Sequence, residues 1–161
     1  MKAVASAMLI VLSIFGWNTW ASDDGQTRNV AQYNLVDNTV GLKGFDPVSI
    51  FPEGGGVALE GDPELFLDFK GVVYYFANME NLNVFLEDPD KYEPTYGGWC
   101  ATAMASGQKI DIQNDLYYIN GRRAHYFVSA DARTAFIENI RRLERRADRN
   151  WNRISGEAPR E

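Results

Sequence analysis

The sequence predicts an α+β domain: a small antiparallel sheet built from hairpins, with short helices and one long amphipathic helix near the C-terminus. Two stretches rich in aromatic and β-branched residues are each interrupted by a turn dipeptide, Lys70-Gly71 and Asn120-Gly121. Residues 136–154 then carry apolar side chains three or four positions apart, which is the period of a helix. Together these patterns indicate two hairpins followed by a helix that packs against them.

The first hairpin is predicted over residues 65–69 and 72–76. Asn78 is a favourable N-cap, and the apolar residues that follow it recur at helical spacing. This helix should end at Asp88-Pro89, because the residue before a proline is pushed out of the helical region.

Residues 48–51 (Val-Ser-Ile-Phe) predict a short strand ahead of that hairpin. The strand is broken by Pro52, and the three glycines at 54–56 predict a flexible loop. Because this loop lacks the Lys-Ser/Thr ending of a P-loop, the sequence excludes that kind of phosphate site.

A tight turn at residues 96–99 (Tyr-Gly-Gly-Trp) leads into an alanine-rich segment, residues 100–106, which predicts a short helix ended by Gly107. The second hairpin is predicted over residues 116–119 and 122–128, joined by Asn-Gly, the strongest short hairpin signal. A two-residue turn at that dipeptide pairs Ile119 with Arg122 and Leu116 with His125.

The final helix is predicted to begin after Ser129 and to close at Gly156. Its apolar stripe consists of Phe136, Ile140, Leu143, Ala147, Trp151 and Ile154. Six arginines lie in the same segment: Arg141, Arg142, Arg145, Arg146, Arg149 and Arg153. Since Glu138, Glu144 and Asp148 interleave with them, we expect a solvated face with i,i+3 and i,i+4 pairs; a docking surface is the alternative.

The N-terminus resembles an export signal. Lys2 precedes an apolar stretch, and Thr19-Trp20-Ala21 offers small residues where a signal peptidase cleaves, before Ser22. An uncleaved anchor is the alternative, although the apolar core is shorter than the ~20 residues that a span needs. The predicted organisation is a signal peptide (1–21), a lead-in (22–39), one domain (40–155) and a tail (156–161), in a periplasmic or secreted protein.

The charge balance argues against nucleic acid and anionic lipid as partners. The 161 residues include 16 basic and 22 acidic side chains, a net charge of −6, which becomes −7 when the signal with its one lysine is removed. The single cysteine, Cys100, excludes an intramolecular disulfide.

Four motifs occur in a characteristic order and spacing: residues 44–48 (Gly-Phe-Asp-Pro-Val), 71–78 (Gly-Val-Val-Tyr-Tyr-Phe-Ala-Asn), 85–92 (Phe-Leu-Glu-Asp-Pro-Asp-Lys-Tyr) and 96–101 (Tyr-Gly-Gly-Trp-Cys-Ala). This set resembles the YHS domain, a small module found in some metal-transporting ATPases and in many exported bacterial proteins. The turn, hairpin and terminal helix that end near Asn150-Trp151 are also similar to the exported branch of that family.

The resemblance does not extend to the cysteines of the family's metal site. In the metal-handling branch, one cysteine follows Asp-Pro-Val and two more follow the Tyr-Phe strand. The matching positions here are Ser49, Ala77 or its neighbour, and Asn81, none of which is a thiolate. Because soft metals select thiolate and thioether ligands, the best-known metal site of the family is absent from this sequence.

Three candidate metal ligands remain: Cys100, His125 and Asp46. Cys100 lies at the predicted start of a short helix, where free N–H groups favour a thiolate; a buried, inert thiol behind Trp99 is the alternative. His125, the only histidine, becomes relevant if its imidazole comes within ~4 Å of the Cys100 sulfur. Asp46 is a third ligand or, as we prefer, a carboxylate that fixes a turn.

An aromatic group is the fourth candidate site, either as core or as the lining of a pocket for a planar or apolar ligand. We expect core packing. Its members are Tyr74, Tyr75, Phe76, Tyr92, Tyr96, Trp99, Tyr117, Tyr118 and Tyr126.

The sequence contains no catalytic motif of the Ser-His-Asp, Cys-x-x-Cys, His-Glu-x-x-His or dinucleotide-binding type. We therefore expect an exported binding module, not an enzyme, that holds a transition metal ion or small ligand or docks onto a protein partner. The alternatives are an interaction or structural module with no small ligand, and a thiol-dependent enzyme that uses Cys100 with His125 as base.

Overall fold

The computed structural model describes residues 28–161, so the predicted signal peptide lies outside the described part of the chain. The strands are β1 (Leu35–Val36), β2 (Val40–Gly41), β3 (Asp62–Phe69), β4 (Val72–Phe76), β5 (Gln113–Asn120) and β6 (Arg123–Phe127). The helices are α1 (Met79–Glu87), α2 (Pro89–Tyr92), α3 (Ala101–Met104), α4 (Ala130–Glu138) and α5 (Ile140–Ser155). Within residues 28–161, no helix has both the length and the apolarity to cross a membrane.

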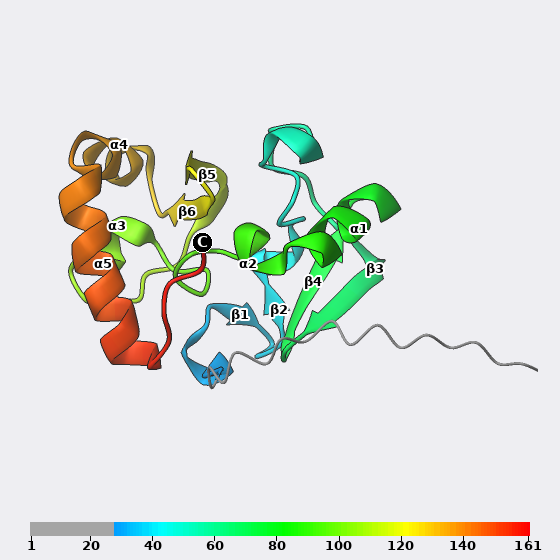
Figure 1. Cartoon of the computed structure of the whole chain (residues 1–161), viewed down its shortest axis with the longest axis horizontal. Coiled ribbons are helices and arrows are strands. Elements are labelled where there is room, and N and C mark those ends of the chain that lie inside the picture. The colour runs from blue at the N-terminus through cyan, green and yellow to red at the C-terminus, as the bar shows by residue number, and fades with distance from the viewer. Residues whose placement is uncertain (1–27) are drawn as a thin grey trace, which may run out of the picture.

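The predicted α+β class is confirmed. One sheet has the strand order β1-β2-β4-β3, and β5 and β6 form a separate antiparallel hairpin. The larger sheet is mixed rather than wholly antiparallel, because β2 runs parallel to β4. Figure 1 shows β3 and α1 at one end of the molecule and α5 at the other.

The β3–β4 hairpin forms where the sequence predicts it. Phe69 pairs with Val72 across a two-residue turn in which Lys70 and Gly71 both have positive φ, 51° and 88°. A turn of this kind matches the twist of the strands, and its glycine has no steric cost there. Side chains alternate along β4, so Tyr74 and Phe76 enter the core.

Helix α1 also begins and ends as predicted. The Asn78 side chain accepts a hydrogen bond from the backbone N–H of Asn81 at 2.8 Å, and Asp88, before Pro89, leaves the helical conformation. Phe85 on its inner face is fully buried and packs edge-on against Phe76, with 5.3 Å between ring centroids.

The predicted strand at residues 48–51 is wrong: this segment is a series of turns. The Asp46 carboxylate accepts hydrogen bonds from the backbone N–H groups of Val48 and Ser49, which diverts those donors from a strand ladder. Phe51 nevertheless packs in the core, where its ring meets Tyr92 at 5.0 Å. The short apolar run therefore reflects burial and not a strand.

The second hairpin is present, but its predicted register is wrong. The turn is centred on Gly121 and Arg122 instead of Asn120-Gly121, so Asn120 pairs with Arg123. His125 consequently lies opposite Tyr118 and not Leu116. Gly121, with φ of 63°, supplies the positive φ at the first turn position.

The predicted C-terminal helix is two helices, α4 and α5, which meet at Asn139. Asn139 leaves the helical region (φ −124°, ψ 26°), and its side chain donates to the Ala135 carbonyl and accepts from Arg142. Asparagine competes for backbone partners in this way at helix ends. Ser129 caps α4 and Gly156 ends α5, as predicted.

The change of direction at Asn139 lets two parts of one apolar stripe reach the core. Phe136 on α4 and Ala147 and Trp151 on α5 are buried. Asn150, beside Trp151, donates to the carbonyl of Met104 and so joins α5 to α3.

Both flanking segments contribute to the folded core. Glu157, after α5, is fully buried and accepts from the hydroxyl of Tyr33 at 2.6 Å. Arg28 and Arg160 both reach the buried carboxylate of Glu93. Burial opposes the charge of Arg28, but attraction by Glu93 outweighs it and raises the pKa of the guanidinium. Residues predicted as a lead-in and a tail therefore close one buried ionic cluster.

Candidate functional site

Asp46 has the structural role that we preferred. Its Oδ1 accepts from the backbone of Val48 at 2.8 Å, and its Oδ2 accepts from the backbone of Ala77 at 2.9 Å and from the side-chain amide of Asn81 at 2.6 Å. The carboxylate is 1% exposed. With both oxygens engaged by donors, it ties the 46–49 turn to the start of α1.

Cys100 is a free, fully buried thiol just before α3. It forms a parallel bridge with Tyr126 of β6, so the two side chains project to the same side of the strand. His125, the preceding residue on β6, projects to the opposite side. This alternation separates the sulfur from the imidazole.

His125 is fully buried, and its Nε2 lies 2.8 Å from Oε1 of Glu144 on α5. Its ring packs 4.9 Å from Phe136 and 5.6 Å from Tyr96, between centroids. Among residues 28–161, Nδ1 has no hydrogen-bond partner, so a proton added there would lack an acceptor. Burial lowers the pKa of His125, although the hydrogen bond that it donates to Glu144 acts to raise that pKa, and the neutral imidazole donates to the carboxylate.

The three candidate metal ligands do not come together. In the described part of the chain, no group of three or more His, Cys, Asp or Glu side chains is arranged to hold a metal ion. Each of the three instead has a packing or hydrogen-bonding role of its own. The aromatic group is largely core, as expected: the buried members are Tyr74, Phe76, Tyr92, Tyr96 and Tyr126.

The two acids of α5 turn toward the β5–β6 hairpin. Glu144 accepts from His125 and from the Asn120 side chain at 2.9 Å. Asp148 accepts from the hydroxyl of Tyr96 at 2.8 Å and forms a salt bridge with Arg123. Burial raises the pKa of Glu144, but the bonds from His125 and Asn120 outweigh it and hold the pKa below its usual value. Both acids therefore point toward the hairpin and not toward the arginines of α5.

The expectation that acids and arginines pair along α5 is wrong, because both acids bind partners on other elements. Within residues 28–161, none of its six arginines forms a salt bridge. Two of them make only neutral contacts: Arg142 donates to Asn139 at 3.2 Å and Arg153 to Asn150 at 2.9 Å. All six are exposed. We call these six side chains the arginine face.

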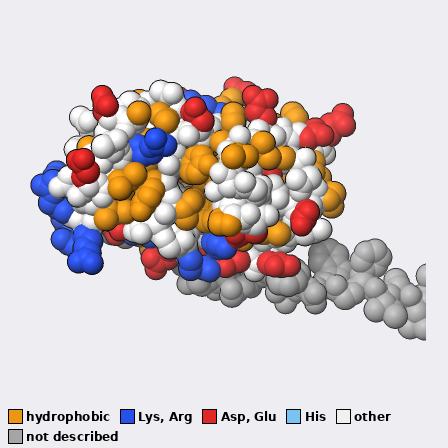
Figure 2. Space-filling view, turned by 90° about the horizontal axis from the view of Figure 1, so that it is seen from above, with side chains coloured by type: hydrophobic (Ala, Val, Ile, Leu, Met, Phe, Trp, Pro, Cys, Tyr) orange, Lys and Arg blue, Asp and Glu red, His pale blue; other side chains and the backbone are white. Residues whose placement is uncertain are grey.

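The arginine face is compact and one-sided. At 100° and 1.5 Å per residue, its members fall within an arc of about 140° and a length of about 18 Å. Helix α5 carries six arginines and two acids, a net charge of +4, so the remainder of the −6 chain carries −10. Figure 2 shows basic side chains gathered at the end of the molecule where α5 lies.

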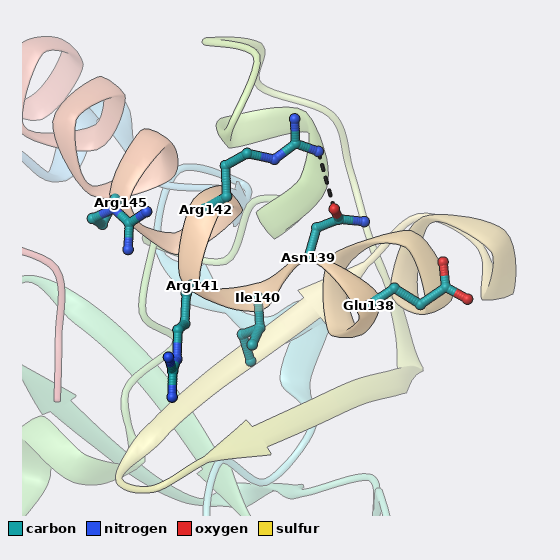
Figure 3. A pocket seen from close by; sticks show the side chains of 6 residues that line it. All are labelled: Glu138, Asn139, Ile140, Arg141, Arg142 and Arg145. Atoms are coloured by element: carbon teal, nitrogen blue, oxygen red, sulfur yellow. Dashed lines mark hydrogen bonds between the residues drawn. The ribbon is translucent and has the colours of Figure 1, made fainter.

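A hollow of about 300 Å³ lies at the junction of α4 and α5. It is lined by Glu138, Asn139, Ile140, Arg141, Arg142 and Arg145. In Figure 3, Glu138 points away from the arginines, while Arg142 reaches back to Asn139. The hollow therefore combines one apolar side chain, Ile140, with three guanidinium groups.

The positions of Glu144 and Asp148 around α5 already indicate in the sequence that these two acids can turn inward. Glu144 and Asp148 are four residues apart and adjoin the buried positions 147 and 151 and the partly buried position 143. On a helical wheel they lie between that stripe and the arginines, where inward partners are within reach. The sequence did not reveal that those partners are Arg123, His125 and Tyr96.

Comparison of the chain with models of protein families, with curated proteins and with solved structures gave no match.

Proposed function

We propose that this chain is a binding module, not an enzyme, and that its arginine face docks onto an acidic protein surface. The proposal rests on one observation: Glu144 and Asp148 bind partners on the β5–β6 hairpin. This leaves six exposed arginines without a salt bridge among the described residues. Maintaining six like charges on one helix face costs stability, and a partner of opposite charge would relieve that repulsion.

The arginines suit carboxylates, and the charge of the remaining residues disfavours nucleic acids and anionic bilayers as partners. The planar guanidinium donates two parallel hydrogen bonds to a carboxylate, and all six cations of the face are arginine, not lysine. The remainder of the molecule carries −10, which opposes close approach of a nucleic acid or an anionic bilayer. Export to the periplasm or beyond, and membership of the YHS type, remain predictions from the sequence.

The test is binding of fluorescently labelled polyglutamate, followed by anisotropy over a range of salt concentrations. We expect binding that weakens as salt rises, because exposed charges are screened. Changing Arg141, Arg145 and Arg149 to Gln should weaken binding at least about tenfold, on the basis of roughly 0.5 kcal/mol for each exposed charge.

The matched control changes Lys70, Lys109 and Arg122 to Gln. It removes the same charge from exposed positions outside α5 and should alter the affinity less than about twofold. Equal weakening by both triple variants would show that net charge, not the arginine face, governs binding. Absence of polyglutamate binding, or tighter binding to phosphatidylglycerol vesicles or DNA, would contradict the proposal.

A further inference from the structure

The end of the molecule opposite α5 carries an acidic surface with an exposed aromatic residue. Phe66 on β3 is 57% exposed, and exposure alternates along the strand so that Asp68 shares its side and Glu64 is exposed ahead of it. Glu80 and Glu87 on the adjoining α1 are exposed as well. Within the described residues, none of these four acids forms a salt bridge.

Protection of a sheet edge accounts for only part of this surface. Strand β3 is at the edge of its sheet, and charged side chains there discourage pairing with other chains. Edge protection does not explain an exposed phenylalanine between the acids, nor the unpaired acids on α1. We call Glu64, Phe66 and Asp68 on β3 the acidic end. The acids of α1 are not part of it, because that helix packs through Phe85 on Phe69, on the face of the sheet opposite to Phe66 and Asp68.

The acidic end and the α4–α5 hollow have complementary chemistry. One presents an aromatic side chain flanked by carboxylates; the other presents Ile140 flanked by Arg141, Arg142 and Arg145, around about 300 Å³ of space. A projecting ring of this kind would pack against Ile140, the one apolar side chain that lines the hollow, and the charges that surround the two surfaces are opposite in sign. The two surfaces lie at opposite ends of the molecule (Figure 1).

We propose that the acidic partner of the arginine face is a second copy of this chain, which presents its acidic end with Phe66 in the α4–α5 hollow. This inference rests on the proposed function and identifies its partner. Because the two surfaces differ and lie at opposite ends, the contact is head to tail. Each added copy leaves one surface of each kind free, so the assembly grows into chains or closes into a ring.

Two complementary variants test the contact by sedimentation velocity. One lacks the arginine surface of the hollow (Arg141→Gln, Arg142→Gln, Arg145→Gln) and keeps the acidic end. The other lacks the projecting surface (Glu64→Gln, Phe66→Thr, Asp68→Asn) and keeps the arginine face. All six side chains are exposed, and Asn at 68 retains an acceptor for the Gly71 N–H.

At about 50 mM salt, the unaltered protein should form concentration-dependent assemblies that dissociate in about 500 mM salt. Each variant alone should sediment as a monomer. An equimolar mixture should form a 1:1 dimer and nothing larger, because each variant retains only one working surface. A monomeric wild-type protein at millimolar concentration, or a mixture that stays monomeric, would overturn the inference.

Polyglutamate binding separates this inference from the proposed function. The variant with the altered acidic end should bind polyglutamate as tightly as the unaltered protein. If it does so and the unaltered protein never self-associates, the arginine face binds another acidic protein and the second-copy inference alone fails. If polyglutamate does not bind either, both proposals fail.

Discussion

The Nε2 atom of His125 on β6 lies 2.8 Å from Oε1 of Glu144 on α5. This hydrogen bond joins the hairpin to the helix, and it also removes one of the two acids that would otherwise offset the arginines of α5. The stability of the fold and the orientation of Glu144 away from the arginine face therefore depend on the same bond.

The first prediction concerns pH. The pKa of His125 is lowered on folding, so the folded protein binds fewer protons than the unfolded chain near the ordinary histidine pKa of 6.5. The stabilisation is complete above that pH and is lost as pH falls below it, by at most about 1.4 kcal/mol per pH unit for one proton. Urea unfolding between pH 7.5 and 5 measures the slope.

His125→Gln is the control for that slope, since glutamine keeps a donor for Glu144 but does not titrate. The variant should show a flatter pH dependence between pH 6.5 and 5. An unchanged slope would mean that another group controls stability in this range. The pKa of Glu144 is also lowered, so a further loss common to both proteins is expected at lower pH.

The second prediction concerns the buried ionic cluster. Glu93 is 1% exposed and balances Arg28 and Arg160. Glu93→Gln leaves Arg28 with no carboxylate partner among the described residues and Arg160 with Glu157 alone, and it should lower the free energy of unfolding by about 3 kcal/mol. Glu87→Gln, at an exposed position, should change it by less than about 0.5 kcal/mol. Similar urea midpoints for the two variants would argue against a stabilising cluster.

The third prediction concerns the thiol. Because Cys100 is fully buried, Ellman's reagent should modify no thiol within minutes in the native protein and one thiol per chain in guanidinium chloride. Rapid native labelling would indicate an accessible thiol and would revive the reactive-cysteine hypothesis.

The fourth prediction concerns Asp46. Asp46→Ala removes the acceptor of four donors and should cost about 3 kcal/mol or more of stability. Zinc should not raise the melting temperature of the unaltered protein, since both carboxylate oxygens already have donors. A zinc-dependent rise that Cys100→Ser or His125→Gln abolishes would support a metal site instead.

The local elements of the fold followed from local signals in the sequence. Lys70-Gly71, Asn78, Asp88-Pro89 and Gly156 each act through the conformation or hydrogen bonding of a few neighbouring residues. The failures arose where a polar side chain competes for nearby hydrogen-bonding groups. The Asp46 carboxylate replaced a strand at 48–51 with turns, and Asn139 divided one apolar stripe between two helices.

The candidate site was less predictable because it depends on contacts between residues far apart in the sequence. The sequence displays the six arginines, but their net effect depends on where Glu144 and Asp148 find partners. Those partners, His125 and Arg123 on β6 and Tyr96 in the turn, are 19 to 52 positions away in the chain. Helical periodicity reports which side chains share a face; it does not report which tertiary contacts hold a charged side chain inward.

The most direct measurement is a map of backbone amide chemical shifts as polyglutamate is added to the ¹⁵N-labelled protein. Binding through the arginine face predicts shift changes concentrated in residues 139–153, with little change in β3, α1 and the 46–49 turn. Those changes should disappear in the Arg141, Arg145 and Arg149 to Gln variant. Shifts that cluster elsewhere, or that remain in this variant, would contradict the assignment of α5 as the docking surface.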